Sequence, residues 1–260
     1  MLRIVTCNIH KGFSQFNRHM SVYDLREELR ASKADIVLLQ EVQGKNRKHA
    51  RNIENWPTKA QHRFLAEDVW LSAAYGCNTV YRNGHHGNAI LSRYPILGAY
   101  NQDVTHYRFE RRGILHCTIA VDGLRAPLHC VSVHLSLFAR SRRLQIGALA
   151  DYLENSVAPA SPMIVAGDFN DWRNEAERLL AERLGLNEAF SAGVGHPGRS
   201  FPAALPVLRL DRIYVRGFSV ADAEIHSGRP WARISDHAAL SADLSWAESR
   251  TSLGAERLAA

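Results

Sequence analysis

The stretch MIVAGDFND, residues 163–171, decides how the rest of this chain is interpreted. Four apolar residues lead into a glycine, and an acid and an amide, Asp168 and Asn170, follow two positions apart. This pattern is typical of a buried strand that ends where two oxygen-bearing side chains emerge on one side. In α/β proteins this end of a sheet carries the chemistry.

Three further apolar runs end in the same manner. Polar side chains follow them at Asn8, Glu41 and His134. Taken singly, such a residue is more often a turn residue or a structural hydrogen-bonding group, so the interpretation depends on their joint occurrence. We predict that these side chains collect at one end of the strands and form the functional site.

Composition and charge narrow the class of protein. The 260 residues are 46% hydrophobic and 22% charged, as in ordinary globular proteins. The net charge of +6 favours a polyanionic partner, although the basic residues are scattered and form no nucleic-acid-binding tail. Because no repeat or linker interrupts the chain, we predict one domain over residues 1–246 and a C-terminal tail over residues 247–260.

Nothing in the sequence indicates secretion or membrane insertion. Three of the four cysteines, Cys7, Cys117 and Cys130, lie in apolar runs without C-x-x-C spacing, so we expect buried thiols. A strand begins directly after Met1, with no signal-peptide core, and no apolar stretch is long enough to span a bilayer. We expect a soluble, cytoplasmic monomer, with peripheral membrane contact left open.

Hydrophobic periodicity predicts three helices and several strands. One helix is expected to follow an N-cap at Ser21, and two more are expected over residues 141–155 and 174–184. Further strands are expected at residues 87–92, 114–121, 210–215 and 238–244. Residues 44–63 are polar and irregular, and are expected to form a loop at the rim of the site.

Several motifs stand together in a fixed order along the chain. Besides Asn8 and Glu41, they are GNAILSRYP (87–95), GDFN (167–170), SFP (200–202), LDRI (210–213) and SDH (235–237). In this order and spacing the chain resembles the endonuclease/exonuclease/phosphatase superfamily. That group includes DNase I, abasic-site endonucleases, sphingomyelinases and inositol polyphosphate phosphatases. The resemblance runs from Arg3 to about Leu244 and is greatest to small bacterial members.

The resemblance implies both a fold and a reaction. The fold is an α/β four-layer sandwich, in which two mixed β-sheets pack face to face and are flanked by helices, as in DNase I-like proteins. The reaction is divalent-metal-dependent phosphoester hydrolysis, with a phosphodiesterase expected and water attacking phosphorus in line. Carboxylate and amide oxygens suit Mg²⁺ or Mn²⁺.

The resemblance also implies roles for individual residues. Glu41 corresponds to the principal metal ligand, Asn8 assists it, and Asp236 stands where a side chain can approach a metal. Asp168 resembles the residue that orients or deprotonates the attacking water. Asn170 corresponds to the side chain that holds the water or a phosphate oxygen.

Histidines complete the implied machinery. His237 resembles the family's phosphate-stabilising histidine, and Asp211 is expected to accept a hydrogen bond from its ring and keep it charged. His134 corresponds to a histidine or tyrosine that contacts the phosphate and protonates the leaving group.

The chain departs from one branch of the family beside Asn8. Abasic-site endonucleases carry an acid two residues later, where this chain has His10 followed by Lys11. The departure weakens the abasic-site interpretation and makes His10 and Lys11 candidate contacts for substrate phosphate. Arg112, in the segment ERRG, is a third such candidate. Three more arginines follow His134 and either grip a polyanion or open a charged helix: Arg140, Arg142 and Arg143.

The substrate stays open between several classes. A phosphodiesterase could act on nucleic acid or on a phospholipid head group. Two alternatives are a phosphatase of small molecules or inositol phosphates, and a catalytically silent binding module on the same fold. A zinc site at His85 and His86 is disfavoured because no paired His/Cys spacing supports it.

Overall fold

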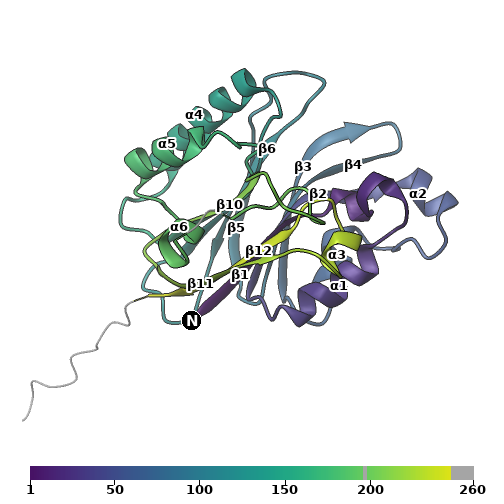
Figure 1. Ribbon diagram of the computed structural model, residues 1–260, viewed down its shortest axis with the longest axis horizontal. Coiled ribbons are helices and arrows are strands. Elements are labelled where there is room, and N and C mark those ends of the chain that lie inside the picture. The colour runs from purple at the N-terminus through teal and green to yellow at the C-terminus, as the bar shows by residue number, and fades with distance from the viewer. Residues whose placement is uncertain (196–197, 247–260) are drawn as a thin grey trace, which may run out of the picture.

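The structure of the protein, a computed structural model, describes residues 1–195 and 198–246. Two six-stranded mixed sheets pack face to face, and helices cover their outer faces (Figure 1). The four-layer α/β sandwich expected from the sequence is therefore confirmed. The predicted tail, residues 247–260, lies outside the described residues, and the single-domain boundary at residue 246 stays a prediction.

The first sheet has the strand order β11-β12-β1-β2-β4-β3. Its central pair, β1 and β2, is parallel, and the other neighbours are antiparallel. Its strands are β1 (Leu2–Asn8), β2 (Ile36–Asn46), β3 (Ser72–Tyr81), β4 (Gly84–Ser92), β11 (Ser219–His226) and β12 (Ala239–Ser245).

The second sheet has the order β5-β6-β7-β8-β10-β9. Again one central pair, β7 and β8, is parallel, and the remaining neighbours are antiparallel. Its strands are β5 (Ile96–Asp103), β6 (Gly113–Ile119), β7 (Leu128–His134), β8 (Met163–Asp168), β9 (Asn187–Glu188) and β10 (Asp211–Arg216).

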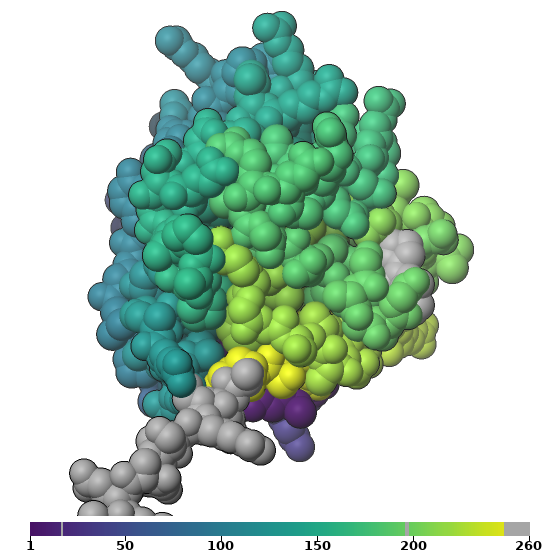
Figure 2. All heavy atoms as spheres, turned by 90° about the vertical axis from the view of Figure 1, so that its left-hand side faces the viewer, coloured from purple at the N-terminus to yellow at the C-terminus, as the bar shows by residue number. Residues whose placement is uncertain are grey.

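Helices form the two outer layers. The α-helices are α1 (Val22–Ala31), α2 (Arg47–Asn52), α3 (Gln61–Ala66), α4 (Ala139–Ser156), α5 (Glu175–Leu184) and α6 (Ala189–Gly193), and the 3₁₀ turns are η1 (His10–Gly12), η2 (Gln15–Asn17) and η3 (Trp231–Arg233). Buried residues of α1 and α3 pack on the first sheet, and those of α4 and α5 pack on the second. Seen from the side of α4 and α5, the teal and green residues of this layer cover much of the molecule (Figure 2).

The apolar runs of the sequence are strands with both faces buried. In β1, Leu2 and Ile4 join the core between the sheets, whereas Val5 and Cys7 join the core beneath α1. Alternate side chains of a strand point to opposite faces, so a central strand of a four-layer protein needs apolar residues at every position. The buried thiols expected at Cys7, Cys117 and Cys130 are confirmed.

Some local expectations were wrong. The segment 44–63 is not an irregular loop, because β2 extends to Asn46, whose side chain accepts the His49 N–H and caps α2. Ser21 stands at the N-cap of α1 as expected, but its Oγ accepts no N–H from the helix and instead donates to the carbonyl of Ile234. Among the described helices, none is both long and apolar enough to cross a bilayer.

Asn88 joins the two sheets through the core. This fully buried side chain of β4 donates from Nδ2 to the carbonyl of Gly113 at 3.0 Å and to that of Ser132 at 3.2 Å. Both carbonyls belong to the second sheet. A buried carbonyl without a donor is destabilising, so these two hydrogen bonds from Nδ2 help to fix how the sheets align.

Removing the Asn88 amide should destabilise the protein. The Asn88→Ala substitution leaves two buried carbonyls without their donor, at a cost of about 2–3 kcal/mol in the free energy of unfolding. Urea unfolding followed by tryptophan fluorescence measures this change. The matched control is Asn155→Ala, because the exposed Asn155 amide donates to the Asp151 carbonyl within α4 and its loss should cost less than about 0.5 kcal/mol. Equal effects of the two substitutions would contradict the bridging role.

Candidate active site

The polar ends of three neighbouring strands lie in one row across the second sheet. The parallel register of β7 and β8 sets His134 opposite Asp168, and the antiparallel register of β8 and β10 sets Asp211 opposite Asp168. All three side chains are buried. The structure therefore brings together residues that stand 34 and 43 positions from Asp168 along the chain.

Gly167 gives Asp168 room at this point. Its φ is +140°, which side chains rarely adopt, and a Cβ here would lie 2.1 Å from the carbonyl oxygen of Val133. Only glycine lets β8 approach β7 so closely before the chain turns. After the turn, Asn170 adopts φ +50° and donates from its backbone N–H to Asp168 Oδ1 and from Nδ2 to the carbonyl of Leu135, both at 2.9 Å.

The first sheet contributes Asn8 to the same place. Asn8 ends β1, and its Nδ2 donates to Asp168 Oδ2 at 3.1 Å, across the gap between the sheets. Its side-chain oxygen accepts the backbone N–H of His10 at 3.1 Å and retains a second lone pair. Ser235 strengthens this junction, because its Oγ donates to the Asn8 carbonyl at 2.6 Å.

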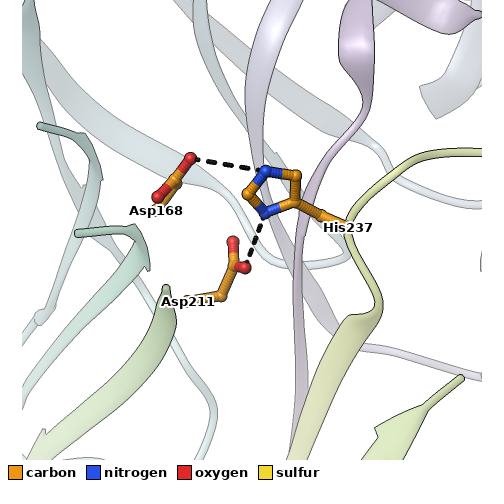
Figure 3. Close-up of side chains that lie close together, drawn as sticks. All are labelled: Asp168, Asp211 and His237. Atoms are coloured by element: carbon orange, nitrogen blue, oxygen red, sulfur yellow. Dashed lines mark hydrogen bonds and ion pairs between the residues drawn. The ribbon is translucent and has the colours of Figure 1, made fainter. Parts of the chain in front are cut away.

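His237 lies between two carboxylates just before β12. Its Nδ1 lies 2.8 Å from Asp211 Oδ2, and its Nε2 lies 3.9 Å from Asp168 Oδ2 (Figure 3). The Nε2 atom of His134 approaches the same Asp168 oxygen at 3.5 Å. One carboxylate oxygen thus faces an amide and two imidazole rings.

The charges of this cluster follow from its surroundings. Burial alone would lower the pKa of His237, but Asp211, Asp168 and Asp236 outweigh it and raise the pKa to about 10. Burial raises the pKa of Asp168 to about 7, opposed by the charge of His237 and by the hydrogen bond from Asn8. Near neutral pH the site therefore holds a charged imidazolium beside a carboxyl group that is ready to exchange a proton.

His134 has the opposite behaviour. Burial, and then the positive charges of Arg112 and other neighbours, hold its pKa well below 6.5. The ring is neutral at pH 7, with one nitrogen that donates and one that accepts a hydrogen bond. Two buried histidines a few ångströms from one carboxylate thus differ in charge because only His237 has a close carboxylate partner of its own, Asp211.

Two arrangements in this region have the donors for a cation. Asp168, Asp211 and His237 offer ligand atoms within 4.8 Å of one another. However, the imidazolium of His237 has no lone pair to give while it bridges the two carboxylates. This group is better described as an ion-pair cluster.

Glu41 is the more suitable centre for a metal. It follows directly on Gln40, which pairs with Asn8 in the sheet, and its backbone adopts φ +57°. Its Oε2 is buried without a hydrogen-bond partner among the described residues, and the ammonium of Lys11 lies 3.5 Å away. A carboxylate oxygen that accepts no hydrogen bond, one residue beyond the strand partner of Asn8, fits a hard, oxygen-preferring cation.

The remaining predicted site residues have charged or polar partners of their own. Asp236 lies 4.0 Å from His10 Nδ1 through Oδ1, and both side chains are partly exposed. Arg112 donates from Nε to the Leu135 carbonyl at 3.2 Å and pairs with Glu110 at 3.1 Å. Lys11 and Arg112 both help to lower the pKa of His134, which places their charges at the site.

The sequence interpretation considered His86 only as a disfavoured zinc ligand and gave it no place beside Glu41. This residue of β4 pairs with Gln43 of β2, and its Nδ1 is buried without a hydrogen-bond partner among the described residues. Burial, followed by the charge of Lys11, lowers its pKa to about 4, and Glu41 acts in the opposite direction. The alignment of β4 with β2 could have revealed it, because that pairing places His86 near Glu41.

Two of the arginines that follow His134 make contacts within the protein and are not free to bind a polyanion. Arg142 is fully buried, lies 4.9 Å over the ring of Trp172, and donates to the carbonyls of Ser136 and Leu137. Arg143 pairs with Glu175 at 2.7 Å. Both side chains therefore hold the start of α4 in place, which agrees with the alternative that these arginines open a charged helix.

Comparisons with known proteins show related sequences and related folds. Residues 5–237 match the profile of the Endonuclease/Exonuclease/phosphatase family. The uncharacterized protein YbhP of Escherichia coli K12 is 45% identical over 242 residues, which are 93% of this chain and 95% of YbhP.

Solved structures show the same fold. An endonuclease/exonuclease/phosphatase from Beutenbergia cavernae superposes with a TM-score of 0.73 at 21% identity, covering 94% of this chain and 71% of that one. An endonuclease/exonuclease/phosphatase family protein from Leptotrichia buccalis gives a TM-score of 0.74 at 17% identity, covering 95% and 100%.

The raised pKa of His237 predicts how stability depends on pH. Because the folded value, about 10, lies above the ordinary 6.5, the folded protein keeps a proton that the unfolded chain releases between these values. His237 thus contributes stability that is complete below about pH 6.5 and lost as pH rises towards 10. The Asp211→Asn substitution should flatten this decline. Urea unfolding across this range in the presence of chelator measures it, with Asp222→Asn on the exposed β11 as control. An unchanged pH dependence in Asp211→Asn would refute the assignment.

Proposed function

The chain belongs to the Endonuclease/Exonuclease/phosphatase family, and from that premise we propose that it is a divalent-metal-dependent phosphodiesterase. Water attacks phosphorus in line and the phosphoester bond is cleaved. The observation that carries the proposal is the position of Asp168. Its Oδ2 faces Asn8, His134 and His237, and its pKa is near neutrality.

Asp168 is the proposed general base. A base works best when its pKa lies near the operating pH, since it must be deprotonated and still attract a proton. The backbone N–H of Asn170 fixes the second oxygen, Oδ1, and leaves Oδ2 to face the reacting groups. Asn170 itself is held by the Leu135 carbonyl, and we propose that its amide orients the water or a phosphate oxygen.

His237 is the proposed stabiliser of negative charge on the phosphoryl oxygens. Asp211 accepts a hydrogen bond from the protonated Nδ1 of the ring. This bond orients Nε2 and keeps the imidazolium charged. A fixed positive donor that is already in place when charge develops requires no reorganisation during the reaction. His134 is neutral in the free protein, so its proposed role is to donate a hydrogen bond to the phosphate, and a general-acid role requires the substrate's charge to raise its pKa.

The metal-binding part of the proposal assigns Glu41 and Asn8 as ligands, with Asp236 close by. A Mg²⁺ or Mn²⁺ ion bound there supplies positive charge to the phosphoryl oxygen and to the leaving oxygen. Lys11 lies beside Glu41, and Arg112 lies where its charge acts on His134. Lys11, Arg112 and His10 are proposed to contact the remaining phosphate oxygens.

Loss of the Asp168 carboxylate should abolish turnover. With bis(p-nitrophenyl) phosphate and Mg²⁺ or Mn²⁺, Asp168→Ala is expected to lower kcat by about a thousandfold, the usual contribution of a positioned general base. Release of p-nitrophenol gives the rate. Asp122→Ala is the control, because Asp122 is an exposed turn residue at the opposite end of β6 and β7. Full activity in Asp168→Ala, or in excess chelator, would overturn the proposal.

A second experiment separates the two cation arrangements. Glu41→Gln removes a charged ligand and should weaken Mn²⁺ binding by at least about tenfold, the lower end of what losing even an outer-shell partner costs. Isothermal titration calorimetry measures this without turnover, with the exposed Glu54→Gln as control. If Asp211→Asn weakened Mn²⁺ binding and Glu41→Gln did not, the metal would belong to the cluster around His237 instead.

A further inference from the structure

An exposed apolar patch lies beside the candidate site. It consists of Tyr107 and Phe109, from the β5–β6 connection, and Leu137 and Phe138, which follow β7. The exposed fractions are 76% for Phe109, 58% for Leu137 and 49% for Phe138, so large apolar side chains meet water here. We refer to these four residues as the rim patch.

The register of the second sheet places the rim patch at the site. β6 pairs with β7 so that Ile114 lies opposite Val133, next to His134. The connection that leads into β6 must therefore lie at the His134 end of the sheet. Phe138 follows His134 by four residues and contacts both rings of the connection, at 5.6 Å from Tyr107 and 5.8 Å from Phe109.

Glu110 ties the rim patch to the phosphate side of the site. Its carboxylate accepts the backbone N–H of Leu137 at 3.1 Å, pairs with Arg112 at 3.1 Å, and accepts the hydroxyl of Ser136. Arg112 in turn donates to the Leu135 carbonyl. The patch is thus fixed before any partner arrives, and its distance from Arg112 is set by the fold.

Positive charge surrounds the rim patch. Arg108 and Arg111 flank Phe109 in the sequence, and Arg140 begins the exposed face of α4. Within residues 1–195 and 198–246, these three guanidinium groups make no hydrogen bond or ion pair. Leu144, one turn beyond Arg140 on the same exposed face, adds another apolar side chain at 52% exposure.

We propose that the rim patch docks the enzyme on an anionic phospholipid surface. Apolar side chains interleaved with arginines are the composition that binds at the boundary between head groups and acyl chains. Each unpaired arginine gains further energy from an anionic leaflet. The net charge of +6 adds a long-range attraction of the same sign.

The geometry of the rings favours a membrane over single-stranded nucleic acid. Bases bind by stacking on open aromatic faces. Here Tyr107 and Phe109 already stack on one another at 5.3 Å and 7°, and Phe138 meets both rings at near right angles. Leucines 137 and 144 have no aromatic face to offer. The rings of the rim patch thus pack on one another as an apolar cluster and are not arranged as separate surfaces for successive bases.

This inference rests on the proposed function for its consequence, which is the substrate class. A phosphodiester whose lipid chains stay in the bilayer would bring its head group to Arg112, because Glu110 holds Arg112 and the rim patch together. The expected substrate is thus an amphiphilic phosphodiester. Docking itself is independent of hydrolysis and is tested separately.

The test is co-sedimentation with vesicles in the presence of chelator, so that no turnover is needed. Vesicles of phosphatidylcholine with a third of phosphatidylglycerol should bind the protein, and Phe109→Ser should lower partitioning by about tenfold, as expected for one apolar anchor. The double variant Arg108→Gln/Arg111→Gln should remove most of the preference for phosphatidylglycerol over pure phosphatidylcholine. Circular dichroism melting checks that each variant is folded.

The matched control is Leu97→Ser. The exposed fraction of Leu97 is 60%, similar to those of the rim patch, but Leu97 stands at the start of β5, next to Ile96, which pairs with Ile119 at the end of the sheet away from the site. Its loss should leave vesicle binding unchanged. Equal binding by Phe109→Ser and Leu97→Ser would overturn the proposal. So would a Phe109→Ser variant that keeps its vesicle binding but loses binding to a single-stranded oligothymidine. Inactivity towards bis(p-nitrophenyl) phosphate would count against the proposed hydrolysis and leave the docking result intact.

Discussion

The hydrogen bond from Asn8 Nδ2 to Asp168 Oδ2 is the contact on which the site depends, because it joins the two sheets at their polar end. Each partner terminates a central strand that is buried on both faces. A slip of either strand by one residue in its pairing register would exchange inward and outward side chains and break this bond. The cores above and below the strands therefore fix the site as firmly as they fix the fold. Asn88, which bridges the same sheets, adds a second constraint on their alignment.

Within this junction, the protein keeps opposite charges close together among side chains that are at most 7% exposed. An imidazolium between two carboxylates is costly to bury unless every partner is satisfied. Asp211 accepts a hydrogen bond from one side of the His237 ring. Asp168, on the other side, accepts hydrogen bonds from the Asn8 amide and from the backbone N–H of Asn170. The charged and polar groups are thus oriented in advance, as the proposed phosphoester hydrolysis would require.

Much of this architecture could be predicted from the sequence, for reasons that also explain the failures. Runs such as residues 163–166 are apolar throughout because both faces are buried, and this signal is hard to mistake. The outer strands β5 and β11 carry mostly exposed or half-buried residues and gave no such signal. Strand ends located Asn8 and Asp168, whereas His86 lies in mid-strand and is positioned only by the pairing of β4 with β2. The contrasting charges of His134 and His237 depend on burial and neighbours, which no linear motif contains.

Glu110 anchors a short connection through contacts to the backbone of Leu137, to Ser136 and to Arg112, and none of these contacts involves the rings of Tyr107 or Phe109. The side chains that face outward are therefore free to vary while the arginine behind them keeps its place. Substitutions at the two ring positions are therefore expected to change the proposed membrane docking and to leave the contact between Glu110 and Arg112 in place. The single carboxylate of Glu110 thus separates the residues proposed for docking from the arginine proposed for phosphate binding. The two groups can therefore change independently within nine residues of chain, 104–112.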